Sequence, residues 1–182
     1  MLISREKRKT NIAEYILYMW QVEDTIRAFG FDIDKLAGEL IDRYDQPPEV
    51  RKEIREWNEN IAAQMKMENV VEAGHIQPLK NIVNELYDLH LFLLRQPSES
   101  LYSEMFARVL PLIREMDVRQ GGTAENEIET CLNAVYVYMM MRLKKVHVST
   151  ETNRAMEQFI RFLAILSKKF REMEESRNGL PT

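Results

Sequence analysis

The feature that most constrains the fold of this chain is a set of apolar stripes with helical spacing, separated by prolines and glycines. After Pro47-Pro48, apolar residues recur three and four positions apart at Val50, Ile54, Trp57, Ile61 and Met65. This spacing places them on one face of an α-helix. No segment shows the strict alternation of a half-buried strand, and only 6 Gly and 6 Pro occur in 182 residues. The sequence therefore predicts an all-α fold.

Proline, glycine and capping residues divide the chain into about six to seven helices. They are expected at about residues 4–29, 33–44, 48 to before 74, 78 to before 97, 100–119, 123–145 and 151–176, with Thr123 capping the sixth. Because the connections are short, neighbouring helices should run antiparallel and pack as a bundle. We expect one helical domain over residues 1–177 and a frayed tail over residues 178–182.

Charge and cysteine content narrow the class of protein. The net charge is −4, and the only basic cluster, residues 4–10, fits a solvated helix start better than a contact with RNA or an anionic surface, so DNA binding is not expected. The single Cys131 permits no internal disulfide and favours a reducing compartment. Polar residues interrupt the apolar start, and no apolar run approaches the length of a membrane span. We expect a cytoplasmic protein.

Three stretches carry a family resemblance that extends over essentially the whole chain. They are "EKRKTNIAEYILYMWQVED", "GHIQPLKNIVNELYDLHLFLL" and "ETCLNAVYVYMMMRL". In this order and spacing the chain resembles a bacterial family of uncharacterised all-helical proteins, known as a domain of unknown function. The resemblance implies a stand-alone helical protein. It implies no catalytic residue, cofactor or substrate.

Metal and nucleophile patterns are weak. Glu72 and His75 have the Glu-x-x-His spacing of a di-iron bundle, but the pattern occurs once and Gly74 interrupts it, so His75 is expected to be a loop or cap residue. Cys131 falls on an apolar stripe, where a thiol is buried, poorly ionised and inert. No metal site, cofactor or catalytic residue is therefore predicted.

A polar seam is the remaining candidate site, since three helices rich in apolar residues also carry polar side chains at helical spacing. Its members are Glu14, Tyr18 and Gln21 on the first helix, Asp88 and His90 on the fourth, and Glu129, Asn133 and Tyr136 on the sixth. Such groups could line a small-molecule cleft. They could equally satisfy one another by hydrogen bonds and fix the register of the bundle. A desolvated Glu14 would be a functional candidate, whereas a solvent-exposed Glu14 would be only a surface glutamate.

The functional expectation rests on the first, fourth and sixth helices, which are apolar almost all the way round. Helices of this kind are either central in the bundle or buried against a partner. We expect a non-enzymatic protein that acts by association, as a homodimer or with another protein. The alternative is a small-molecule-binding protein or a weak enzyme that uses the polar seam.

Overall fold

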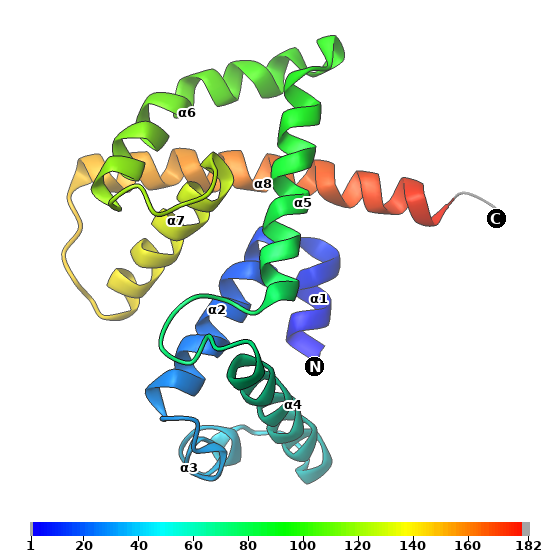
Figure 1. Cartoon of the computed structure of the whole chain (residues 1–182), viewed down its shortest axis with the longest axis vertical. Coiled ribbons are helices and arrows are strands. Elements are labelled where there is room, and N and C mark those ends of the chain that lie inside the picture. The colour runs from blue at the N-terminus through cyan, green and yellow to red at the C-terminus, as the bar shows by residue number, and fades with distance from the viewer. Residues whose placement is uncertain (1, 180–182) are drawn as a thin grey trace. The chain divides into compact units, whose positions relative to one another are not determined.

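The computed structural model describes residues 2–179, and within this range it consists of helices joined by turns and loops, without strands. The α-helices are α1 (Leu2–Thr10), α2 (Ile12–Ala28), α3 (Ile33–Glu39), α4 (Pro48–Met67), α5 (Gln77–Leu94), α6 (Ser100–Arg119), α7 (Glu127–Leu143) and α8 (Thr150–Asn178), with 3₁₀ turns η1 (Ile41–Arg43) and η2 (Pro97–Glu99) (Figure 1). The predicted all-α class is confirmed. Within the same range, every helix is too short or too polar to span a lipid bilayer.

Two predicted helices are divided in the structure. The helix expected over residues 4–29 breaks at Asn11, which separates α1 from α2. Asparagine is a poor residue for a helix interior and a favoured one at a helix start, so a break there follows from its side chain. The helix expected over residues 33–44 ends as an α-helix at Glu39 and continues into η1 after Leu40. This divided start accounts for the eight α-helices among residues 2–179, where six to seven were expected.

The N-termini of α7 and α8 are each capped by the side chain of the preceding residue. Asn126, not Thr123, caps α7, because its side-chain oxygen accepts a hydrogen bond from the Glu129 N–H at 2.9 Å. Ser149 caps α8, because its side-chain oxygen accepts a hydrogen bond from the Thr152 N–H at 3.1 Å. The helix then continues to Asn178, one residue into the predicted tail, and residues 180–182 of that tail lie outside the described residues.

The chain forms two compact units. The N-terminal unit comprises the residues up to Lys9 together with Glu14–Ile82, and the C-terminal unit comprises Thr10–Ala13 together with the residues from Val83 onward. Helix α5 begins in the first unit and ends in the second.

The N-terminal unit is built around the buried faces of α2 and α4. On α4 the predicted stripe is confirmed where Ile54, Ile61 and Met65 are buried, and α3 and η1 pack against this helix. On α2 the buried residues include Ile16, Met19, Trp20 and Ile26. Their spacing of three and four residues explains why one face of α2 is withdrawn from solvent.

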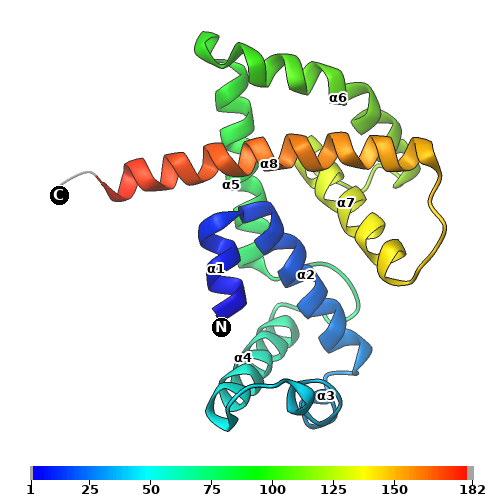
Figure 2. The ribbon, with the colours of Figure 1, turned by 180° about the vertical axis from the view of Figure 1, so that it is seen from behind.

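The C-terminal unit is a packed group of α6, α7 and α8. Helices α6 and α8 run in opposite directions, and α7 contacts both (Figures 1 and 2). The core is rich in aromatic side chains from α8, of which Phe159 and Phe162 are completely buried. Ile113 from α6 and Ile128 from α7 are buried in the same unit.

The aromatic core gives a direct test of this packing. Phe159→Ala should lower the free energy of unfolding by about 3–5 kcal/mol, because it removes buried apolar area and leaves a cavity. Ile160→Ala is the neighbouring control, since Ile160 is 44% exposed and its truncation should cost less than about 1 kcal/mol. Chemical denaturation followed by circular dichroism measures both. Equal losses for the two variants would contradict the assigned face of α8.

Candidate functional site

The part of the polar seam carried by α2 lies toward solvent. The side chain of Glu14 is 56% exposed, and its Oε2 atom lies 2.8 Å from the Lys7 Nζ atom of α1. The half-buried ring of Tyr18 stacks on Trp57 of α4 at 6.4 Å between centroids, and burial raises the pKa of its hydroxyl. Gln21 is exposed. Glu14 is therefore a surface glutamate, which is the second of the two alternatives considered for it.

The part of the seam carried by α7 is half-buried. Glu129, Asn133 and Tyr136 all have intermediate exposure. The Glu129 carboxylate accepts a hydrogen bond from the Glu125 N–H at 2.6 Å, while the Glu129 N–H donates to Asn126. These two bonds satisfy backbone donors at the start of a helix, which would otherwise lack partners. Glu129 thus has a structural role at the N-terminus of α7.

The two seam residues on α5 differ sharply in environment. Asp88 is exposed, whereas only 1% of His90 is exposed. The His90 Nδ1 atom lies 2.7 Å from the Tyr102 hydroxyl, and its ring makes edge contacts with Phe106 and Phe162 at 4.5 and 5.8 Å between centroids. Burial lowers the pKa of His90 to about 4, so the imidazole is neutral at pH 7. His90 is a hydrogen-bonded core histidine.

The eight seam residues are divided between the two units. Glu14, Tyr18 and Gln21 belong to the N-terminal unit, and the five residues on α5 and α7 belong to the C-terminal unit. The role of these residues in binding a ligand stays a prediction.

A buried carboxylate, which the sequence reasoning missed, organises the N-terminal unit. Glu23 of α2 is completely buried, and its Oε2 atom lies 2.6 Å from the Nδ1 atom of His75. Its Oε1 atom accepts a hydrogen bond from the Ile76 N–H at 2.9 Å. The His75 ring stacks face to face on Trp20, with 4.3 Å between the ring centroids. His75 lies in the loop just before α5, as the sequence indicated.

Arg27 extends this contact along the same face of α2. Its guanidinium donates hydrogen bonds to the carbonyl oxygens of Val70, Val71 and Gly74 and pairs with Asp24. The positions of Trp20, Glu23 and Arg27 are three and four residues apart, so the three side chains share one face of the helix. We call this set, with His75, the α2 latch, because it holds the loop of residues 68–76 against α2.

The α2 latch had a detectable signal in the sequence. Glu23 lies on the stripe of Ile16, Met19, Trp20 and Ile26, where an acidic residue must be buried with a partner or break the stripe. The partner could not be found from spacing, because His75 is 52 residues away and lies outside any helix. The Glu72–His75 pattern does not form a helical pair, since α4 ends at Met67.

The sequence also carries a single thiol and a possible pair of metal ligands. Cys131 is completely buried in α7, and burial raises the pKa of its thiol, so it stays protonated. Among residues 2–179, no three His, Cys, Asp or Glu side chains gather as they would around a metal ion.

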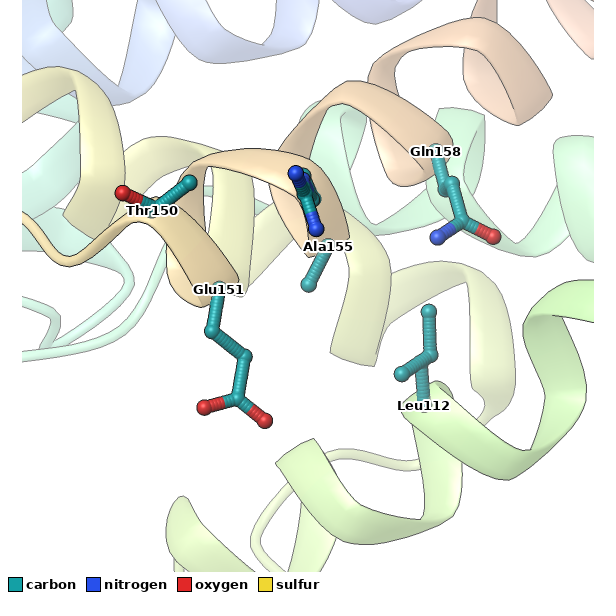
Figure 3. Close-up of a pocket in the computed structure, with 6 residues that line it drawn as sticks. Leu112, Thr150, Glu151, Ala155 and Gln158 are labelled. Carbon is teal, nitrogen blue, oxygen red and sulfur yellow. The ribbon is translucent and has the colours of Figure 1, made fainter.

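An open hollow of about 520 Å³ lies between α6 and the first turns of α8. Figure 3 shows Leu112 of α6 on one side and Thr150, Glu151, Ala155 and Gln158 of α8 on the other. The start of α8 is already capped, since Ser149 accepts the Thr152 N–H, and Glu151 adds a negative charge there. We therefore assign no ligand to this hollow.

The chain matches the model of a known protein family over most of its length. The model of a family described as "Domain of unknown function (DUF4924)" matches residues 1–177 of the 182. Neither a curated protein nor a solved structure matches the chain.

Removing the buried carboxylate of the α2 latch should destabilise the N-terminal unit. Glu23→Gln keeps the shape of the side chain but removes the charge that faces His75, and we expect a loss of about 1–3 kcal/mol in unfolding free energy. Glu14→Gln is the matched control, because the exposed pair of Glu14 with Lys7 contributes less than about 1 kcal/mol. Urea denaturation at pH 7 compares them. A loss for Glu14→Gln as large as that for Glu23→Gln would contradict the latch.

The environment of His90 predicts a pH dependence. Its pKa is about 4 in the folded protein and 6.5 ordinarily, so the unfolded chain binds a proton more readily, and stability falls as the pH drops from 6.5 toward 4. His90→Gln removes this titration and can still hydrogen-bond Tyr102. Between pH 7 and pH 4.5 the native protein should lose about 2–3 kcal/mol more unfolding free energy than the variant does.

The exposed His147 supplies the control for this experiment. His147→Gln should follow the native pH profile, because His147 is exposed in the folded chain. Parallel profiles for His90→Gln and the native protein would show that His90 is not buried as described.

Proposed function

The chain belongs to the family named as a domain of unknown function, DUF4924, and we propose that it acts by protein association, through the second half of α7. The family description assigns no activity, so the support comes from the residues of this chain. The proposed role is non-enzymatic, and the proposed partner is a second copy of the chain.

The second half of α7 is apolar yet not buried. Seven of the eight residues 136–143 are apolar or aromatic, and all eight are at least partly exposed. The first half of the same helix is different, since Ile128, Cys131 and Leu132 are completely buried. Val137 is 55% exposed and Leu143 is 61% exposed. A surface helix normally has a polar face toward water, so this segment resembles one that packs against another surface.

One stripe of this segment suits a partner best. Tyr136, Val137, Met140 and Met141 are spaced one and four residues apart and therefore share a side of the helix. We call this stripe the α7 face. Methionine side chains adapt to irregular surfaces, and aromatic and methionine residues are enriched in protein interfaces.

The absence of charge on the α7 face supports a second copy as the partner. The one charged residue in the segment, Arg142, donates to the Tyr138 hydroxyl at 3.1 Å, and Tyr138 in turn donates to Asn153 of α8. This holds the guanidinium away from the α7 face. A two-fold interface places the same patch on both sides, so an uncharged apolar stripe can pair with itself without repulsion.

The other expectations from the sequence accompany this proposal. A cytoplasmic location agrees with the single free Cys131, and a bacterial source is proposed from the family resemblance alone. Binding of a small molecule, or a weak enzymatic activity, at the polar seam is the rival function. The exposure of Glu14 and Gln21 weighs against it, because a small-molecule site usually encloses its polar groups.

Multi-angle light scattering of the full chain tests the association. The native protein should show twice the mass of one chain, and Val137→Glu should weaken the dimer at least about tenfold, because it buries a carboxylate in an apolar contact. Val118→Glu is the matched control. It makes the same change at a 78% exposed valine of α6 and should leave the dimer intact.

Two results would refute the proposal. One is a native chain that stays monomeric at the highest concentration studied, and the other is equal weakening by Val118→Glu and Val137→Glu. Unchanged helical circular dichroism of both variants excludes unfolding as the cause of a lost dimer.

A further inference from the structure

A groove of about 400 Å³ lies in the C-terminal unit, away from the α7 face. It is bordered by Tyr87 of α5, by one side of α6 from Phe106 to Asp117, and by residues 124–130 at the start of α7. Pockets that hold small organic ligands have volumes from about 300 Å³ upward, so the groove is large enough for one.

The aromatic residues that form the apolar wall of the groove also pack on a buried side chain. Phe106 and Tyr87 line the groove, and both rings also pack on the buried His90, at 4.5 and 6.2 Å between centroids. His90 is itself bonded to Tyr102. Leu110 and Ile113 complete the apolar lining. The wall therefore exists before any ligand binds, which lowers the entropic cost of binding.

The groove is also lined by four charged residues, two from α6 and two at the start of α7. Asp117 and Glu127 are half-buried, and Arg114 and Glu125 are more exposed. In the part of the chain that the structure describes, the side chains of these four residues form no ion pair and no hydrogen bond. Partial burial of an unpaired carboxylate costs free energy, which a bound cation would offset.

The sign of the charge favours a cation over an anion. Three carboxylates and one guanidinium line the groove. The neighbouring His90 does not offset this charge, because burial holds its pKa at about 4 even though the Glu127 carboxylate raises it. An anion would need the free N–H groups at the start of α7, but Asn126 and Glu129 already accept two hydrogen bonds there.

We propose that this groove binds a small organic cation, in which an ammonium group is attached to an apolar or aromatic body. The body packs on the rings of Tyr87 and Phe106, and the ammonium group lies between Asp117 and Glu127. This inference is independent of the association through the α7 face. It concerns a different surface and can hold whether or not the chain dimerises.

Nuclear magnetic resonance of the ¹⁵N-labelled full chain tests the groove with three probes of equal size. 2-Phenylethylamine carries the cation, 2-phenylethanol is its neutral analogue, and phenylacetate carries an anion. The amine should shift the amide signals of residues around Phe106, Asp117 and Glu127, with a dissociation constant at least about tenfold lower than that of the alcohol. Phenylacetate should bind more weakly than both.

Charge-removing variants locate the binding. Glu127→Gln and Asp117→Asn should each weaken binding of the amine about three- to tenfold and should leave the affinity for the alcohol unchanged. Glu104→Gln is the control, because Glu104 lies on α6 outside the groove and its side chain is 63% exposed. It should bind the amine as the native chain does.

Each result of these binding experiments either supports or overturns the proposal. Amine-specific shifts at the groove that Glu127→Gln or Asp117→Asn weakens support the proposal. Equal affinity for the three probes, shifts confined to residues outside the groove, or no shift at about 10 mM amine would overturn it. Native-like amide spectra of the free variants ensure that a lost response reports binding and not unfolding.

Discussion

The buried carboxylate of Glu23 is the interaction on which the N-terminal unit depends. A carboxylate without water is strongly unfavourable unless several donors surround it. Here the donors come from His75 and the Ile76 backbone, so burial of Glu23 requires the loop of residues 68–76 in one conformation. That loop has no regular hydrogen-bond ladder of its own. Its conformation is therefore set by the side chains of α2 that contact it, and α5 begins where this loop ends.

The C-terminal unit also buries polar side chains, but these carry no charge. His90 and Tyr102 satisfy each other in a shell of aromatic rings, and burial keeps the imidazole neutral. A neutral pair costs little to desolvate, so the surrounding helices can pack closely around it. The start of α7 borders the groove of this unit and its second half carries the α7 face. Glu127 and Val137 are ten residues apart, about 15 Å along the helix, so the two surfaces are physically separate.

The helices could be predicted from the sequence because their signals are local. The apolar spacing of α4 and the start of that helix at Pro48 both act within a few residues, and both were confirmed. The break at Asn11 was missed because no proline or glycine marks it. The candidate site was harder, since the partner of Glu23 lies 52 residues away in a loop. Periodicity identifies the buried face of a helix but not the residues that pack against that face.

Cys131 gives the C-terminal unit a property that follows from its burial. Its thiol is the only one in the chain, is withdrawn from solvent and stays protonated. A thiol reagent can therefore react only when α7 separates from its neighbours, and the labelling rate measures how often this opening occurs. The labelling rate of this single thiol therefore reports the opening of α7, the helix that carries both proposed surfaces.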